Sequence, residues 1–313
     1  MKFIKYTKVW FAISILLILA GVGAMINNKI QHGKILAYGI DFTGGTLMEI
    51  SFQKGVEANQ QDQFRSNMKQ VFTDILFSEQ EGQSVSEPQV IVTNEGHFVI
   101  QTKNMSEEEL QSVSKAIESK LGKFELVRFN TIGPKIGETL KQKAFVAIII
   151  ALIAIVLFIA YAFRKVPKKV SPWKFGFAAI IALVHDILIT VGVFALLGYE
   201  VNAFFITALL TIMGFSVHDT IVVFDRIREN LKKQGRDDTF GDVADISLNQ
   251  TMARSINTSL STLFPLFALY MFGAPAIHTF VFALIVGIVV GTYSSIYIAS
   301  PLLTIWQERG RLR

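Results

Sequence analysis

GFSVHDTIVVFDRIREN, residues 214–230, places the ionisable pair His218 and Asp219 inside an apolar run that is long enough to cross a bilayer. An aspartate at the middle of a membrane helix costs roughly 2.5 to 3.5 kcal/mol on insertion scales, so one that is present usually faces the bundle interior and handles ions. The stretch therefore predicts a transmembrane helix with a functional carboxylate. The alternative is that the buried polar groups only hold helices together, at about 1 kcal/mol each.

Hydropathy predicts six such helices in the chain, which is 313 residues long and 51% hydrophobic. The apolar runs approach the length of about 20 residues that spans hydrocarbon. The last run is long for one crossing, so either it tilts or its first turn, after Ala274, Pro275 and Ala276, lies outside the hydrocarbon. The predicted spans are Val9–Ile26, Ala144–Phe163, Phe175–Leu197, Val201–Phe224, Ile256–Phe272 and Ile277–Trp306.

Lysine and arginine residues gather on one side of these spans, whereas the loops 198–200 and 273–275 contain neither. Because basic residues are retained on the cytoplasmic side, we expect both termini to be cytoplasmic and residues 27–143 to be external. The external segment holds 13 basic and 15 acidic residues, so the net charge of +5 arises near the cytoplasmic face and nucleic-acid binding is not needed to explain it. The basic clusters are Lys2, Lys5 and Lys8; Arg164, Lys165, Lys168, Lys169 and Lys174; Arg226, Arg228, Lys232, Lys233 and Arg236; and Arg309, Arg311 and Arg313.

This pattern divides the chain into three parts: an N-terminus and first span (1–26), an external domain (27–143) and five further spans with their loops (144–313). Lysines before an apolar run that ends in small residues also fit a cleavable signal, which would leave five spans. The first run is longer than a usual signal, which favours a retained anchor. The chain has no cysteine, so the external domain cannot rely on disulfides.

The external segment predicts a small α+β domain. Its hydrophobic period changes between 2 and 3.6 in the order β-α-β-β-α-β, which is the ferredoxin-like pattern of two helices on a four-stranded antiparallel sheet. No nucleophile with a base, metal-spaced histidine cluster or phosphate loop is present, so we assign it no catalysis, no metal and no cofactor. The predicted strands and helices are 46–52, 59–76, 89–93, 97–102, a helix capped by Ser106 that runs to 121, and 124–131, with a turn at 94–96.

The segment before the first strand, GIDFTGGT, carries a pair of glycines that allows backbone conformations closed to other residues. This segment predicts either a simple turn or a hinge between the external domain and the membrane. Its motif residues are Gly39, Asp41, Phe42, Gly44 and Gly45.

Polar side chains also occur in two other spans. His185 and Asp186 lie at membrane depth in the third, where conduction and simple packing are both open readings. In the fifth, Arg254, Thr258 and Ser261 fall on one side of the helix. Such faces are expected to pack toward one another or toward a partner chain and to enclose a wet path.

These positions suggest an ion path. In this hypothesis Asp219, with His218 beside it, takes up a proton from one side and releases it to the other, while Arg254 holds the ionised form. Two glycines of the sixth span, Gly287 and Gly291, have the small-xxx-small spacing that predicts close helix contact.

The motifs GIDFTGGTLMEI and HDTIVVFDRIREN, together with six spans and one external domain, resemble the SecD/SecF family of protein-export membrane proteins, within the resistance-nodulation-division superfamily. The resemblance covers nearly the whole chain. It implies a bacterial cell-membrane subunit of the Sec pathway that is not an enzyme and that uses a proton, or in some organisms sodium, gradient. It places the family's essential aspartate at Asp219 and its functional arginine at Arg254.

The same resemblance implies SecD, the SecYEG channel and a translocating preprotein as partners, besides membrane lipid. Two other readings stay open. One is half of a small-molecule exporter, which would need a second copy or another chain to complete it. The other is a noncatalytic scaffold or receptor whose external domain only binds partners.

Overall fold

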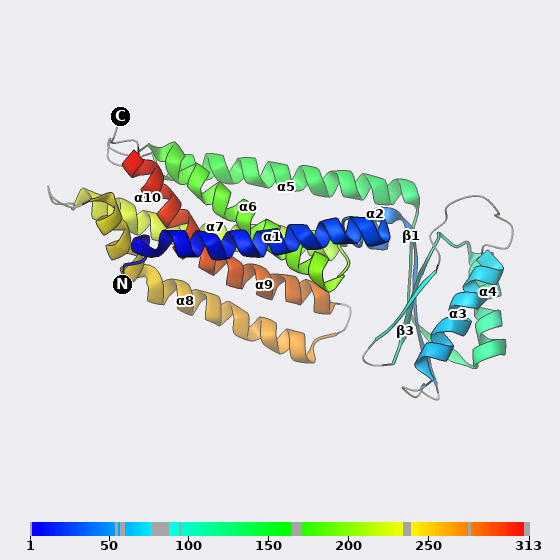
Figure 1. Ribbon diagram of the computed structural model, residues 1–313. Helices are drawn as coiled ribbons and strands as arrows, with labels where there is room; N and C mark the ends of the chain where they lie inside the picture. Colours follow the sequence, from blue (N-terminus) through cyan, green and yellow to red (C-terminus); the bar gives the residue numbers. More distant parts are fainter. Residues whose placement is uncertain are drawn as a thin grey trace. The chain divides into compact units, whose positions relative to one another are not determined.

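The computed structural model consists of a helical unit and a smaller α/β unit (Figure 1). It describes residues 2–53, 56, 60–76, 88–93, 96–164, 171–233, 239–274 and 277–309. Residues 38–143 form one compact unit, and residues 1–37 together with 144–313 form the other. The remaining residues include part of the predicted turn at 94–96 and several of the basic loop positions, namely Lys165, Lys168, Lys169, Arg236, Arg311 and Arg313.

Among the described residues, six helical segments are long and apolar enough to cross a membrane. All six predicted spans are present as helices, and several of these continue beyond the apolar segments. A short 3-10 helix, η1 (Ile4–Tyr6), precedes the first. The six begin with α1 (Thr7–His32), α5 (Pro134–Ala162), α6 (Pro172–Leu197), α7 (Ala203–Lys232), α8 (Phe240–Phe272) and α9 (His278–Ser294).

The last segment is not one uniform α-helix. After α9 the chain forms a π-helical turn, η3 (Ser295–Ala299), and then α10 (Ser300–Arg309). The apolar run predicted to start at Ile277 becomes α-helical at His278, while Pro275 and Ala276 lie outside the described residues. A π turn inside an α-helix is rare and frequently marks a functional site.

Local sequence fixes the ends of several of these helices. The Asn202 side chain accepts the backbone N–H of Phe205 at the start of α7. Thr239 and Asp242 form a reciprocal capping box at the start of α8. Both arrangements satisfy N–H groups that a helix end otherwise leaves unbonded. At the C-terminal end of α6, Gly198 takes a left-handed conformation with φ 67°.

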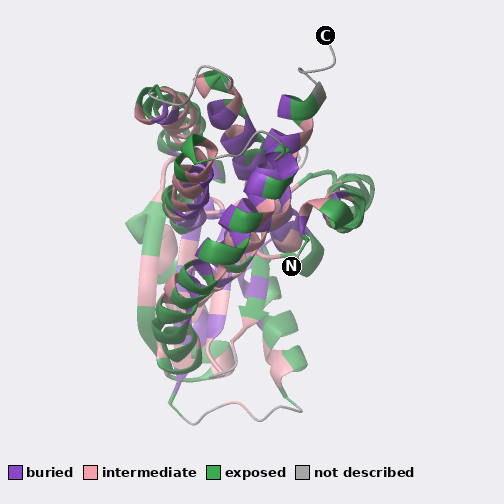
Figure 2. Cartoon of the chain, turned by 90° about the vertical axis from the view of Figure 1, so that its left-hand side faces the viewer, coloured by how far each residue is buried: buried purple, intermediate pink, exposed green. Residues whose placement is uncertain are grey.

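Helices α6, α7 and α9 supply most of the buried residues of the helical unit, whereas α1 and α5 expose apolar side chains along much of their length. Figure 2 colours each described residue by how far it is buried. Small residues permit the closest helix approaches. A Cβ at Gly21 of α1 would lie 2.7 Å from the Cα of Gly192 on α6, and a Cβ at Gly287 of α9 would lie 2.2 Å from Ile212 on α7. The predicted close helix contact at Gly287 and Gly291 is confirmed.

The α/β unit contains one four-stranded antiparallel sheet with strand order β2-β3-β1-β4. The predicted strands and helices occur in the predicted order. Besides a short helix, α2 (Ile40–Thr43), the elements are β1 (Gly45–Phe52), α3 (Gln61–Leu76), β2 (Gln89–Val92), β3 (Phe98–Thr102), α4 (Glu107–Leu121) and β4 (Phe124–Ile132).

Alternation along β1 and β3 places large apolar side chains on the sheet face that α3 and α4 cover. Met48 pairs with Ile100 in the register of the two strands, and both are fully buried. Phe72 of α3 and Ile117 of α4 belong to the same cluster. Burial of each such side chain contributes about 1.5 to 3 kcal/mol, so this unit has a core without disulfides.

The predicted cap of α4 is confirmed. The Ser106 hydroxyl accepts the backbone N–H of Glu109, and the Glu109 carboxylate accepts the backbone N–H of Ser106. That second hydrogen bond, together with Lys103 nearby, lowers the pKa of Glu109. The ionised form of Glu109 therefore supports this end of the helix.

Candidate functional site

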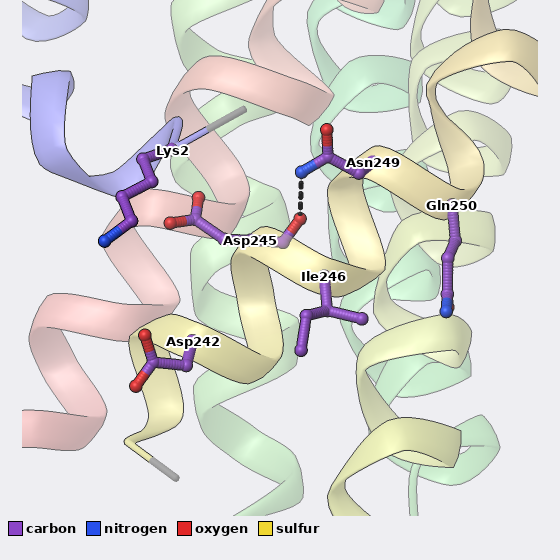
Figure 3. Close-up of a pocket in the computed structure, with 6 residues that line it drawn as sticks. All are labelled: Lys2, Asp242, Asp245, Ile246, Asn249 and Gln250. Carbon is purple, nitrogen blue, oxygen red and sulfur yellow. Dashed lines mark hydrogen bonds between the residues drawn. The ribbon is translucent and has the colours of Figure 1, made fainter.

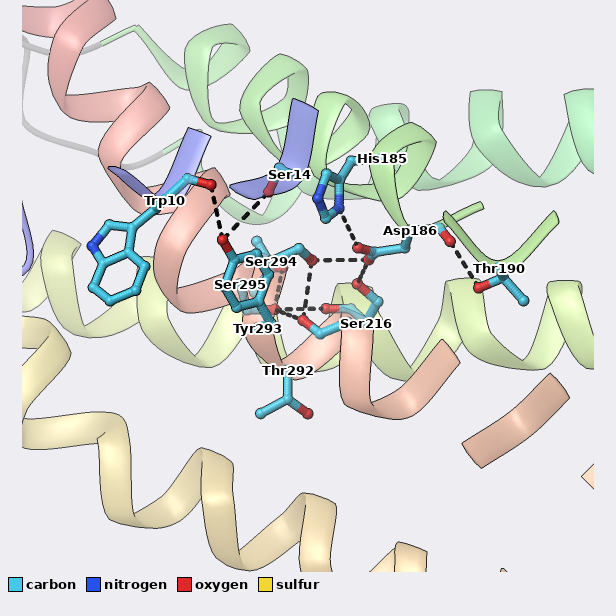
Figure 4. Close-up of polar contacts among 12 residues, drawn as sticks. Trp10, Ser14, His185, Asp186, Thr190, Ser216, Thr292, Tyr293, Ser294 and Ser295 are labelled. Atoms are coloured by element: carbon cyan, nitrogen blue, oxygen red, sulfur yellow. Dashed lines mark hydrogen bonds and ion pairs between the residues drawn. The ribbon is translucent and has the colours of Figure 1, made fainter. Parts of the chain in front are cut away.

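The centre of the helical unit contains a buried carboxylate, Asp186 of α6, with hydrogen-bond donors from three helices (Figure 4). His185 Nδ1 lies 3.0 Å from Asp186 Oδ1. The other oxygen, Oδ2, accepts hydrogen bonds from Ser216 Oγ of α7 at 2.6 Å and from Ser294 Oγ of α9 at 2.9 Å. Asp186 is 0% exposed and His185 is 6% exposed.

Close packing of α7 against α9 brings the two serines together. A Cβ at Gly291 would lie 3.0 Å from the Cβ of Ser216, so only glycine lets the helices meet at this level without displacement. Ser294 follows Gly291 by three residues and therefore lies on nearly the same face of α9. The glycine thus positions both hydroxyls around Asp186.

The π turn adds a second inward-facing hydroxyl. Ser295 Oγ lies 2.9 Å from Thr220 Oγ1 of α7 and 3.0 Å from the carbonyl oxygen of Gly291. Ser294 and Ser295 are both 0% exposed.

Asp219 of α7 is also buried, at 4% exposed. The hydroxyls of Ser255 and Ser295 lie near its carboxylate, and His218 and Arg254 are close enough to act on it electrostatically. Within the described residues neither Asp219 Oδ2 nor Ser255 Oγ completes a hydrogen bond. A buried carboxylate oxygen without a partner is unusual and calls for a ligand, a water or an ion.

Two residues predicted for the ion path, His218 and Arg254, lie on the surface of the helical unit rather than inside it. The predicted polar face of α8 does not point into the bundle, since Ser261 is exposed and Thr258 only half-buried. The inward face is one residue further along. It consists of Ser247, Thr251, Ser255 and Ser259 at four-residue spacing.

The expectation that polar faces pack toward each other therefore holds for α6 and α7, with α9 and the serine face of α8 as partners. The face of α8 that carries Arg254 is exposed, so the other option, packing against a partner chain, stays a prediction for it.

The sequence reasoning missed Ser294 and Ser295. Hydroxyls in an apolar helix often bond to their own backbone, so they carry little hydropathic signal. Two adjacent serines shortly after Gly291, in a predominantly apolar span, would have been the available clue.

His185 packs on its outer side against Tyr293, with ring centroids 6.2 Å apart. The Tyr293 hydroxyl donates to the carbonyl oxygen of Trp10 at 2.9 Å, which ties α9 to α1. His185 Nε2 is buried and has no hydrogen-bond partner among the described residues.

The glycine motif of the α/β unit forms a compact corner. Gly39 caps α2, which contains Asp41 and the buried Phe42, and Gly44 and Gly45 follow with φ 71° and 126°. A Cβ at Gly44 would lie 2.7 Å from the Cα of Pro134, at the start of α5. The motif is therefore a turn packed against the first residues of α5.

An open hollow lies elsewhere, beside the N-terminal end of α8 (Figure 3). Asp245 in its wall accepts the backbone N–H of Ile4 at 3.0 Å. None of the predicted site residues lines it, and its walls are Lys2, Asp242, Asp245, Ile246, Asn249 and Gln250.

Two family models match the chain. Residues 112–309 match the model described as "Protein export membrane protein SecD/SecF, C-terminal". Residues 36–56 match the "SecD/SecF GG Motif", which contains the glycine corner described above.

Curated relatives are similar over almost their full length. Protein translocase subunit SecF of Thermobaculum terrenum is 40% identical, covering 99% of this chain and 95% of that protein. SecF of Vibrio alginolyticus is 36% identical, covering 96% and 88%.

A solved structure is similar as well. The crystal structure of SecDF, described as a translocon-associated membrane protein from Thermus thermophilus, superimposes with a TM-score of 0.80 at 33% identity. The match covers 99% of this chain but only 39% of that longer chain.

Proposed function

The chain belongs to the SecD/SecF family of protein-export membrane proteins, and from that premise we propose that it is an accessory subunit of a Sec protein translocase. Together with SecD it couples the proton gradient, or a sodium gradient, to the export of preproteins. The relatives named protein translocase subunit SecF support the first part. The buried carboxylates support the second.

The observation that carries the coupling is the state of Asp219, a buried carboxylate with one oxygen lacking a partner among the described residues. One charge that moves through 100 mV yields about 2.3 kcal/mol, enough to shift a two-state element appreciably. In the proposed cycle Asp219 binds the ion from one side and releases it to the other. Arg254 stabilises the ionised carboxylate between these events, and His218 lies at the mouth of the path.

The exposed position of His218 and Arg254 supports a partner helix on that side of the bundle. A cationic side chain cannot face lipid without cost. We therefore assign this surface to SecD. The SecDF relative of Thermus thermophilus is a single longer chain, and the match to the present protein covers 36% of its length.

The α/β unit completes the proposal as an external, ferredoxin-like domain that engages the preprotein while the SecYEG channel lies nearby. Its strand order agrees with that fold. The corner at Gly44 and Gly45 packs against the start of α5, so a movement of α5 reaches β1 directly. In this arrangement the helical unit spans the bacterial inner membrane, and both termini are cytoplasmic.

The test is preprotein transport in inverted membrane vesicles with imposed pH and sodium gradients, comparing the native chain with Asp219→Asn. We expect the variant to insert and to co-purify with SecD, but to lose gradient-dependent transport. Asp225→Asn is the matched control, because Asp225 lies on the same helix and pairs with Arg228 near its end.

Normal transport by Asp219→Asn would remove the carboxylate from the mechanism. If Asp219→Asn and an Arg254 replacement both bind SecD and both support normal transport, the chain is a scaffold instead.

A further inference from the structure

Asp186 is not needed by the ion path proposed above, yet it is fully buried among three hydrogen-bond donors. An ionised carboxylate only accepts hydrogen bonds, whereas a protonated one must also donate. With His185 in the Nδ1–H form, all three contacts are donations to Asp186. In that tautomer the arrangement is that of an ionised carboxylate, whereas an unprotonated Nδ1 would accept a hydrogen bond from the protonated acid.

The Ser294 hydroxyl has two acceptors within reach and one hydrogen. It lies 2.9 Å from Asp186 Oδ2 and 3.1 Å from the carbonyl oxygen of Gly291. If Asp186 binds a proton, its carboxyl can donate to Ser294 Oγ, and the serine hydrogen turns to Gly291. Ser294 thus reports the protonation state of Asp186.

The carbonyl oxygen of Gly291 cannot satisfy every donor around it. The backbone N–H of Ser295 donates to this oxygen, and the hydroxyls of Ser294 and Ser295 lie 3.1 and 3.0 Å away. A carbonyl oxygen has two lone pairs. With the N–H occupying one, the two hydroxyls compete for the other.

This competition links the two carboxylates. While Ser294 donates to Asp186, Ser295 is free to donate to Gly291. Once Ser294 turns to Gly291, Ser295 must find another acceptor. The acceptors around it are Thr220 Oγ1 at 2.9 Å, the carbonyl oxygen of Ser216 at 3.4 Å and the nearby carboxylate of Asp219.

We propose that Asp186 is a second proton-binding carboxylate of the ion path, coupled to Asp219 by the hydroxyls of Ser294 and Ser295, so that a proton on one acid favours the ionised form of the other. The inference rests on the proposed role of Asp219. It gives Asp186 and the two serines a part in regulating when Asp219 releases its proton.

At the π turn, two adjacent residues of one helical segment, Ser294 and Ser295, lie close to the two different carboxylates. Neighbouring residues of a helix point about 100° apart, so adjacent serines can serve two different targets. The ionisable groups around the pair are few. They are His185 on α6, His218 on α7, Arg254 on α8 and Tyr293 on α9, and the α1 residues that bond to Tyr293 are the uncharged Trp10 and Ser14.

The experiment is a pH titration by infrared difference spectroscopy of the full chain, purified with SecD in lipid. Loss of a protonated-carboxyl band in Asp219→Asn identifies the Asp219 signal. In Asp186→Asn the neutral amide imitates a protonated acid, so Ser295 is directed to Asp219. We expect the midpoint of the Asp219 band to move down by about one pH unit, a tenfold change within the usual range of coupling between sites.

A second substitution tests the route. Adding Ser294→Ala to Asp186→Asn frees Gly291 for Ser295 and should cancel the shift. Ser300→Ala is the matched control, since Ser300 is fully buried in the same segment but donates to a backbone carbonyl, that of Ser295, at 3.1 Å. This control should leave the shift unchanged.

An Asp219 midpoint that is the same in the native chain and in Asp186→Asn overturns the inference. If Asp186→Asn does not assemble, Ser294→Ala alone decides. It should make the two carboxyl bands titrate independently, and a titration that stays coupled also overturns the inference. The proposed function fails separately, if the native chain shows coupled titration but supports no gradient-dependent transport.

Discussion

Gly44 shows how a single residue constrains the α/β unit. Its backbone has φ 71° and ψ 169°, a region open essentially to glycine alone. In addition, Cα and N of Pro134 lie 2.7 and 2.9 Å from where a Cβ would be. Backbone conformation and lack of space therefore both exclude a side chain.

Gly122 separates these two effects. It has similar angles, φ 105° and ψ 179°, but no atom within 4 Å of its Cβ position. Gly122→Ala should destabilise the protein by roughly 1 to 3 kcal/mol through backbone strain alone. Gly44→Ala should cost more, because β1 and the start of α5 must also separate. Thermal unfolding of the two variants in detergent measures the difference, and equal melting temperatures would show that the Pro134 contact carries no energy.

For single residues, the sequence allowed the burial of charged side chains to be predicted, but it gave little indication of which hydroxyl groups are buried. Burial of Asp219 and Asp186 follows from the cost of a carboxylate in hydrocarbon. Ser294 and Ser295 carry no such penalty and therefore gave little signal in the hydropathy. The phase of α8 was missed by one residue, because polar side chains surround this part of the helix and both Arg254 and Ser255 fit an amphipathic pattern.

Helices α7 and α9 pack so closely at Gly287 that no side chain fits there. A Cβ at Gly287 would meet three carbon atoms of Ile212 at 2.2, 2.4 and 2.7 Å. Because the branch of the isoleucine is involved as well as its tip, rotation about one bond cannot relieve the overlap. The spacing of α7 and α9 depends on this glycine.

Gly287→Ala should therefore destabilise the bundle by about 1 to 3 kcal/mol through overpacking. Gly214→Ala on α7 is the control. Nothing lies within 4 Å of its Cβ position, so the higher helix propensity of alanine should leave stability unchanged or raise it by up to about 1 kcal/mol. Resistance to denaturant in detergent compares the two.

The double variant Gly287→Ala with Ile212→Val tests the cause. Removing one methylene should recover part of the loss. If the double variant is less stable than the sum of the two single changes predicts, the clash with Ile212 is not the reason.

Element type could be predicted well here, and element length could not. Hydropathy marks where a helix lies in hydrocarbon, but backbone hydrogen bonds continue into water. Thus α5 begins at Pro134, ten residues before the predicted span, and α7 runs on to Lys232. The π turn was missed because hydropathy does not distinguish it from an α turn.

On the scale of the whole molecule, the chain consists of an apolar bundle and a separately cored α/β unit inserted between its first two spans. The alternating distribution of lysine and arginine predicts which side each loop occupies. This orientation is a prediction that chemical labelling from one side of the membrane tests.

The absence of cysteine from the sequence makes the orientation easy to test, because the native chain has no thiol for a maleimide to label and is therefore the negative control. Single cysteines at Ser112 of α4 and at Lys233, just after α7, are both at exposed positions. A membrane-impermeant maleimide added to intact spheroplasts should label Ser112→Cys at once. It should label Lys233→Cys only after the membrane is opened. The reverse pattern would invert the proposed topology.

The π turn at Ser295–Ala299 also affects how related sequences should be compared. A π turn accommodates one residue more than an α turn, so a helical wheel drawn through α9 is out of phase with one drawn through α10 by about 100°. A relative with one residue fewer between Gly291 and Ser300 would have an uninterrupted α-helix there. Aligning such a relative with this chain needs a gap inside the helix. After the gap, residues that occupy the same face of the helix correspond, although their distances from Gly291 along the sequence differ by one.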